Sequence, residues 1–165
     1  MGDYSIRLEG DIGPLRKKLA ALRLSGPDLA GLNQTLAEVL RESTLRRFDT
    51  ATGPDGKKWK KSIRAATEGG QTLVNTADLK NSIHAIATSD MAAVGTNKVY
   101  ARTHQFGDER TIRSRRKKAL AFQIGGKWVS KKSVRVKIPA RPYLGVDDGD
   151  MAEIRATVAE FIKDR

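Results

Sequence analysis

The chain has 165 residues, no cysteine and a formal net charge of +12 at pH 7. This length predicts a single domain, residues 1–165, with a core of its own. The lack of cysteine excludes disulfides and thiolate metal sites. No apolar run approaches the about 20 residues that a membrane span needs. We therefore expect a soluble protein that is made in a cytoplasm and has no membrane contact.

The positive charge is concentrated in one region of the chain. Residues 108–138 hold eleven Lys or Arg and two acids, which is a local net charge of +9. Residues 139–165 hold four Lys or Arg and six acids, a net charge of −2. A bias of this size favours contact with polyanions or with acidic protein surfaces.

Helices dominate the expected structure of the first third. Alternating residues predict a strand over 4–9, and apolar spacing predicts a helix over 14–22. The longest helix is predicted over 27–48. Its apolar stripe consists of Leu29, Leu32, Leu36, Val39, Leu40 and Phe48. Such a stripe packs on a core or binds a partner, and core packing is the favoured interpretation.

A turn-rich stretch follows over 51–71, where we expect a mobile loop because it includes Gly-Pro-Asp-Gly and Gly-Gly sequences. Trp59 stands between lysines in this stretch. The indole could stack on a nucleic-acid base. Packing of Trp59 against the core is the favoured alternative.

Residues 76–107 predict a short helix capped by Thr76, then two strands, over 84–89 and 91–95, joined by a turn at residues 89–90. Tyr100 and His104 follow, four residues apart, so on a helix their rings share one face. His104 could act as a general base beside Tyr100. Because no nucleophile or orienting acid lies nearby, we expect Tyr100, His104 and Phe106 to pack, with Gly107 ending the segment.

A basic loop is expected over 108–119. Six residues of the stretch 110–118 are basic: Arg110, Arg113, Arg115, Arg116, Lys117 and Lys118. Sequence-independent contact with phosphates is one interpretation. A loop that becomes ordered on an acidic protein partner is the other. The sequence of this stretch favours neither of these two interpretations.

The last third predicts an antiparallel meander and a closing helix. Alternating residues indicate strands over 119–124, 127–130 and 133–138, and Pro139 stops further pairing. An acidic turn at residues 147–150 suits the start of a helix whose apolar stripe runs from Met151 to Ile162. The expected fold class is α+β, with N-terminal helices packed on an antiparallel β-meander and a closing C-terminal helix.

Motifs for catalysis and cofactor binding are missing from the sequence. There is no HExxH, no His/Cys pair and no Gly-x-Ser-x-Gly elbow. The two Gly-Lys pairs lack both the earlier glycine and the following Ser or Thr of a phosphate loop. We expect no enzyme activity, no catalytic residues, no cofactor and no metal.

Several blocks together resemble the phage virion morphogenesis family, also called the phage tail completion family. They are Gly-Pro-Asp-Gly at 53–56 with Trp59, residues 73–83, Val-Gly-Thr-Asn at 94–97, residues 100–107 and residues 138–145. Asn75 and Ala77 depart from the Asp and Gly that are usual in the second block. The resemblance marks the following residues as structural motif positions: Trp59, Tyr100, His104, Phe106, Gly107, Pro139, Arg141 and Pro142.

The resemblance implies a structural phage or prophage protein that completes the tail or neck so that head and tail can join. By analogy it implies a homo-oligomeric ring, with a hexamer as the expected size, that contacts other neck or tail proteins. It also implies a virion component that is assembled in the host bacterial cytoplasm. The alternative is a non-specific nucleic-acid-binding module that uses the basic loop 110–118.

Overall fold

The computed structural model describes residues 26–115, 119–124 and 126–163. The strand predicted over 4–9 and the helix predicted over 14–22 lie outside these residues, as do Arg116, Lys117 and Lys118. The elements are α2 (Gly26–Thr50), α3 (Ile63–Thr67), α4 (Asp78–Asn81), β1 (His84–Ala87), β2 (Ala92–Gly95), α5 (Ala101–Phe106), β3 (Asp108–Arg113), β4 (Leu120–Ile124), β5 (Lys127–Lys131), β6 (Ser133–Ile138) and α6 (Asp148–Lys163).

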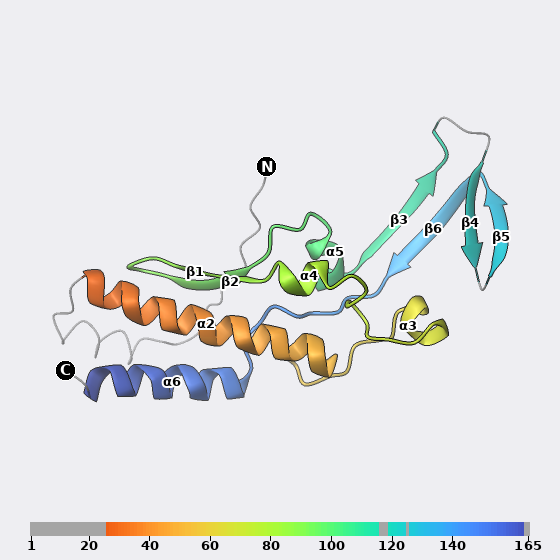
Figure 1. Ribbon diagram of the computed structural model, residues 1–165. Helices are drawn as coiled ribbons and strands as arrows, with labels where there is room; N and C mark the ends of the chain where they lie inside the picture. Colours follow the sequence, from red (N-terminus) through yellow and green to blue (C-terminus); the bar gives the residue numbers. More distant parts are fainter. Residues whose placement is uncertain (1–25, 116–118, 125, 164–165) are drawn as a thin grey trace.

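Helix α2 is the axis of the body (Figure 1). It lies between α6, which runs beside it in the opposite direction, and the β1–β2 hairpin. Because it is covered on two sides, α2 buries polar as well as apolar residues. Thr44 is fully buried, and its hydroxyl donates to the Leu40 carbonyl at 2.8 Å. The helix predicted over 27–48 and the packing of its stripe on the core are both confirmed.

Aromatic rings from three distant segments form the centre of the core. Phe48 at the end of α2 contacts Trp59 edge-on, with ring centroids 5.7 Å apart, and Tyr143 at 5.2 Å. Leu79 and Ile83 pack against the same cluster. Trp59 is 7% exposed, so its predicted anchoring in the core is confirmed. Such ring pairs stabilise a fold by about 0.5–1.5 kcal/mol beyond the area they bury.

The strands form three separate antiparallel pairs in the described residues: β1–β2, β3–β6 and β4–β5. The α+β class with a closing helix is confirmed. The pairing differs from a simple meander because β3 pairs with β6 and the β4–β5 hairpin lies between them in sequence. The loop expected over 108–119 is therefore wrong over residues 108–113, where β3 pairs in register from Asp108 with Ile138 to Arg113 with Ser133.

Two smaller predictions also change. The stretch 51–71 contains α3 and a bridge between Thr52 and Lys58, so it is only partly loop. Thr76 does not cap α4. Its hydroxyl donates to Asp78 Oδ2 at 2.7 Å, and Ala77 takes the N-cap position with φ of 60°. The hairpin predicted around residues 89–90 is confirmed by the pairing of β1 with β2.

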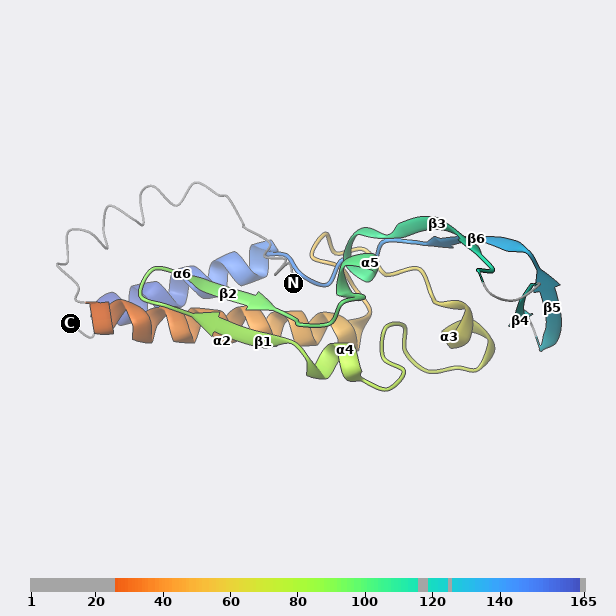
Figure 2. The same ribbon diagram turned by 90° about the horizontal axis from the view of Figure 1, so that it is seen from above.

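Strands β3, β6, β4 and β5 extend away from the body as an arm (Figure 2). Cross-strand register separates the two faces of its proximal part. Ile112, Val134, Val136 and Ile138 share one face, whereas Arg113, Arg135 and Lys137 share the other. The valines are only half-buried and Ile112 is exposed. Asp108 and Arg110, which pair with each other, lie on the first face as well. The arm thus has a mostly apolar face that the described residues cover only partly.

A buried ion cluster joins α2, the segment before α6, and α6 itself. The side chain of Arg47 is 6% exposed and pairs with Asp147 at 3.0 Å and with the buried Asp150. Its guanidinium also donates to the Gly145 carbonyl at 2.8 Å and to the Tyr143 carbonyl at 3.3 Å. A buried pair of this kind stabilises a fold only if its remaining donors are also satisfied, as most are here.

The start of α6 depends on the same carboxylates. The Asp150 backbone N–H donates to Asp147 Oδ1, and the Asp147 backbone N–H donates to Asp150 Oδ2, both at 2.9 Å. This reciprocal arrangement is a capping box built from two aspartates. The acidic turn predicted to begin the last helix is confirmed, and Arg47 links it to α2.

Gly107 ends α5 in a conformation that suits only glycine. Its φ is +76°, and an added Cβ would lie 2.9 Å from both the Ala140 nitrogen and the Ile138 oxygen. The predicted role of Gly107 at the end of this segment is confirmed. The close approach lets β3 leave the body directly beside the end of β6.

Replacing Arg47 with Met should lower the free energy of unfolding by about 3–5 kcal/mol, because it leaves the buried Asp150 carboxylate without its partner. Urea unfolding monitored by Trp fluorescence measures this loss. The matched control is Arg46→Met on the same helix, where an exposed pair with Glu153 spans 3.9 Å and should contribute less than about 1 kcal/mol. Equal losses in the two variants would contradict a structural role for the cluster.

Replacing Gly107 with Ala should destabilise the protein more than Gly56→Ala does. Gly56 has a nearly equal φ of +73°, but an added Cβ there meets nothing within 4 Å. Gly56→Ala therefore measures backbone strain alone, about 1–2 kcal/mol. Gly107→Ala adds a backbone clash of about 1–3 kcal/mol. Similar melting temperatures for the two variants would show that the close approach at Gly107 is unimportant.

Candidate functional site

The junction between body and arm is organised by the side chain of Gln105 on α5. Its amide oxygen accepts from the backbone N–H groups of Tyr143 and Leu144, both at 3.0 Å. Its amide nitrogen donates to the Leu144 carbonyl at 2.8 Å. The buried Gln105 thus satisfies backbone groups that would otherwise be unpaired in the core.

The segment 139–145 passes between α5 and the loop that carries Trp59. Pro142 contributes its carbonyl, which accepts from the Trp59 indole N–H at 2.8 Å. Arg141 donates from its backbone N–H to the His104 carbonyl at 2.7 Å and from Nε to the Lys60 carbonyl at 2.8 Å. The Tyr143 hydroxyl lies 3.4 Å from the Ala101 carbonyl. The structure therefore brings together Trp59, His104, Gly107, Arg141 and Pro142.

Tyr100 and His104 share a face, as predicted, with ring centroids 5.9 Å apart in an edge-on arrangement. Phe106 does not pack with them. It is 65% exposed, so the prediction that it packs is wrong. On the short helix α5, Gln105 instead of Phe106 faces the core, because the buried positions are Ala101 and Gln105, four residues apart.

His104 is held in its neutral form. Burial, and then the nearby Arg141 charge, lower the pKa of His104 below its usual 6.5. Its Nδ1 is buried and has no hydrogen-bond partner among residues 26–115, 119–124 and 126–163. Serine and threonine hydroxyls near the ring belong to loops and caps, and none is hydrogen-bonded to the imidazole in the described part of the chain. The arrangement lacks the nucleophile–base pair that acyl-transfer chemistry requires.

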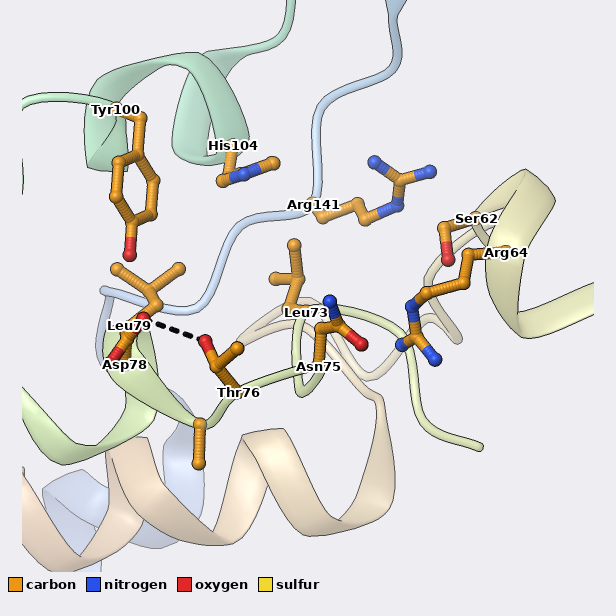
Figure 3. Close-up of a pocket in the computed structure, with 11 residues that line it drawn as sticks. Ser62, Arg64, Leu73, Asn75, Thr76, Asp78, Leu79, Tyr100, His104 and Arg141 are labelled. Atoms are coloured by element: carbon orange, nitrogen blue, oxygen red, sulfur yellow. Dashed lines mark hydrogen bonds between the residues drawn. The ribbon is translucent and has the colours of Figure 1, made fainter. Parts of the chain in front are cut away.

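A pocket of about 260 Å³ opens beside this junction (Figure 3). His104 on α5 and Tyr100, the residue before that helix, reach toward it, while Leu73, Asn75 and Thr76 lie opposite them. Its polar lining includes Arg64, Asn75, Asp78, Tyr100, His104 and Arg141. Arg64 is held by the carbonyls of Gly69, Gln71 and Val74, so it closes the preceding loop.

The basic residues predicted to meet a partner lie on the arm, away from this pocket. Arg110 and Arg113 are in β3, and Arg115 follows it. Arg110 pairs with Asp108 at 3.0 Å. Arg113 and Arg115 are exposed and have no carboxylate within 4 Å among the described residues. Positive charge is thus neutralised at the base of the arm and left free toward its tip.

Three residues that organise the site were missed by sequence reasoning: Arg47, Gln105 and Tyr143. Arg47 falls among other charged residues of an amphipathic helix, so its burial has no local signal. Gln105 could have been found from its four-residue spacing to Ala101, since both would face the same side of a helix. The partners of Tyr143 lie about 40 to 100 residues away and leave no trace in local spacing.

Neither a membrane span nor a metal site is present in the part of the chain that the structure describes. None of its helices is long and apolar enough to cross a bilayer. These residues also hold no group of three His, Asp or Glu side chains that could bind a metal ion.

As the pH decreases below 6.5, the free energy of unfolding should decrease because of His104. The unfolded chain binds a proton near that pH, whereas the lowered pKa of the folded state delays protonation. The free energy of unfolding should be constant above about pH 7 and should decrease by at most about 1.4 kcal/mol per pH unit below 6.5. His104→Gln should flatten this dependence between pH 5.5 and 7.5. An unaltered pH profile in His104→Gln would contradict the assignment.

Comparison with known proteins gives a family for this chain. Residues 11–163 match the phage virion morphogenesis family. The chain is 30% identical over 134 residues to the Mu-like prophage FluMu G protein 2 of Haemophilus influenzae, an alignment that covers 81% of this chain and 78% of that protein. No solved structure matches.

The family match spans the body, the junction and the arm, so it includes every site described above. The chain belongs to the phage virion morphogenesis family and is a structural protein of bacteriophage assembly.

Proposed function

We propose that the protein completes the tail or neck of a phage particle so that head and tail can join, and that it acts as a homo-oligomeric ring, with a hexamer as the expected size. Other neck or tail proteins are its expected partners, and assembly takes place in the host cytoplasm. The observation that carries this proposal is the arm, which extends beyond the body and keeps one face partly uncovered.

Physical reasoning supports a partner for the arm. An isolated two-stranded ribbon is marginally stable in water. Its apolar face includes Ile112, which is 43% exposed, and Val134 and Val136, which are half-buried. Packing of this face against a neighbouring copy would complete its burial. Closed repetition of one such contact generates a ring.

The exposed basic side chains support a second candidate function. Arg113 and Arg115, with Lys131 and Lys132, give the outer arm several cations and no acid. Trp128 is 72% exposed close to them in sequence. Cations beside an exposed indole suit non-specific contact with nucleic acid. In a ring this surface would face either DNA or an acidic neighbour.

Ile112→Glu should abolish self-association without unfolding the chain, because it places a charge on the exposed apolar face. In a phage that lacks its own copy, this variant should leave filled heads and unjoined tails, visible by electron microscopy. Thr111→Glu is the matched control, since it lies on the opposite face of the same strand. Sedimentation of the purified variants measures the oligomeric state.

Charge reversal separates the two candidate functions. Arg113→Glu with Arg115→Glu should abolish salt-dependent binding to duplex DNA if the arm meets nucleic acid. A wild-type chain that sediments as a monomer and is dispensable for head–tail joining would overturn the proposal. Loss of DNA binding in the double variant, with joining intact, would favour the second candidate.

A further inference from the structure

Two arginines of this protein are buried to the same extent but have opposite environments. Arg47 is 5% exposed and pairs with two carboxylates. Arg141 is 6% exposed and has no carboxylate within 4 Å among the described residues. Burying a cation without a counter-charge is costly. The charge of Arg141 therefore calls for an anion that the described residues do not supply.

The neutral hydrogen bonds of Arg141 leave its outer nitrogens for such an anion. Nε donates to the Lys60 carbonyl, which fixes the plane of the guanidinium. No hydrogen bond from Nη1 or Nη2 occurs within the described chain. Because Nε already donates to Lys60, the two Nη groups remain as a planar pair of donors that matches the geometry of a carboxylate. Arg141 lines the pocket beside α5 (Figure 3).

His104 adds a second donor to the same pocket. Its buried Nδ1 has no hydrogen-bond partner in the part of the chain that the structure describes. An unpaired buried N–H is rarer than an unpaired acceptor, so the proton belongs on Nε2. The ring then offers Nε2–H to a ligand. Burial and the charge of Arg141 lower the pKa of His104, which keeps it a neutral donor near pH 7.

The other residues that line the pocket indicate which kind of ligand would fit it. Leu73 and Leu79 provide apolar walls that suit methylene groups. Two arginines line the pocket, Arg64 and Arg141, and the guanidinium of Arg64 already donates to three backbone carbonyls. The carboxylate of Asp78 also lines the pocket, and its charge disfavours a doubly charged phosphate more than a singly charged carboxylate. The volume of about 260 Å³ lies below the about 300–1,000 Å³ of pockets for larger ligands. An acidic side chain with a short aliphatic stem fits these features.

We propose that this pocket receives the carboxylate side chain of an acidic segment of a partner protein, with Arg141 as its main receptor and His104 as a second donor. Glutamate suits the site best, because its two methylene groups can contact Leu73 and Leu79. The site is separate from the arm and does not depend on whether the protein joins heads to tails.

The test uses the full chain labelled with ¹⁵N, whose two histidines give separable imidazole signals. N-acetyl-glutamate amide is titrated at pH 7.5 and constant ionic strength. Its uncharged counterpart, N-acetyl-glutamine amide, and inorganic phosphate are titrated in parallel. The His104 signals should shift saturably with the glutamate compound and respond at least tenfold more weakly to the glutamine compound. His84, which is exposed and held at 3.0 Å from the Ser82 carbonyl, is the internal reference.

Two variants locate the ligand. Asp78→Asn removes the like charge at an exposed position and should tighten binding of the glutamate compound severalfold. Arg141→Lys keeps the charge but loses the planar fork, so it should weaken binding at least tenfold. Because Arg141 is buried, Asp78→Asn keeps the test decisive if Arg141→Lys does not fold.

Three outcomes would overturn the proposal. One is an equal response of His104 and His84 to the glutamate compound, or none at all. A second is unchanged affinity in Asp78→Asn. The third is tighter binding of phosphate than of the glutamate compound, which would assign the pocket to a phosphate ligand instead. The titration requires no phage particles, so its failure is distinguishable from failure of the proposed tail or neck function.

Discussion

The pairing of Arg47 with Asp147 and Asp150 is the constraint on which the rest of the body depends. It joins the last turn of α2 to the first turn of α6, and its carbonyl acceptors at residues 143 and 145 tie down the connecting segment. Burial raises the pKa of Asp147, but hydrogen bonds from the Asp150 backbone and Arg47 outweigh burial and lower it. The carboxylate therefore stays charged, and its contribution to stability is lost only as the pH falls through that lowered pKa.

The position of residues 139–147 determines the structure of the junction between body and arm. Tyr143 is held between Phe48 and the helix α5, where Gln105 satisfies its backbone. Gly107 then brings the start of β3 against the end of β6, because only a residue without Cβ allows that approach. The pocket beside His104 and the direction of the arm are both consequences of how residues 139–147 are held.

Features with a local signal were predictable from the sequence. The apolar spacing of α2 and α6 and the β1–β2 hairpin each depend on residues close in sequence. The anchoring of Trp59 was predicted from its residue type, although one group that holds it, the Pro142 carbonyl, lies 83 residues away. Strand β3 was not predictable in this way, since its exposed charges resemble a solvated loop. Its strand structure comes from pairing with β6, about 25 residues later, and the hairpin of β4 and β5 separates the two. Alternation does not specify which strand is the partner.

The candidate site also contains some features that were predictable from the local sequence and others that were not. Tyr100, His104 and Gly107 were identified from spacing and turn chemistry, whereas the exposure of Phe106 was not, because an aromatic residue in a short helix is usually expected to pack. The exposed side chains of Phe106 and Ile112 and the buried side chain of Arg141 have a common physical explanation. Among the described residues, Arg141 has no carboxylate within 4 Å, and the arm has a face that is only partly covered. Contact with the partners proposed above would satisfy both features. Association through these two features is the physical basis of assembly that we propose for this member of the phage virion morphogenesis family.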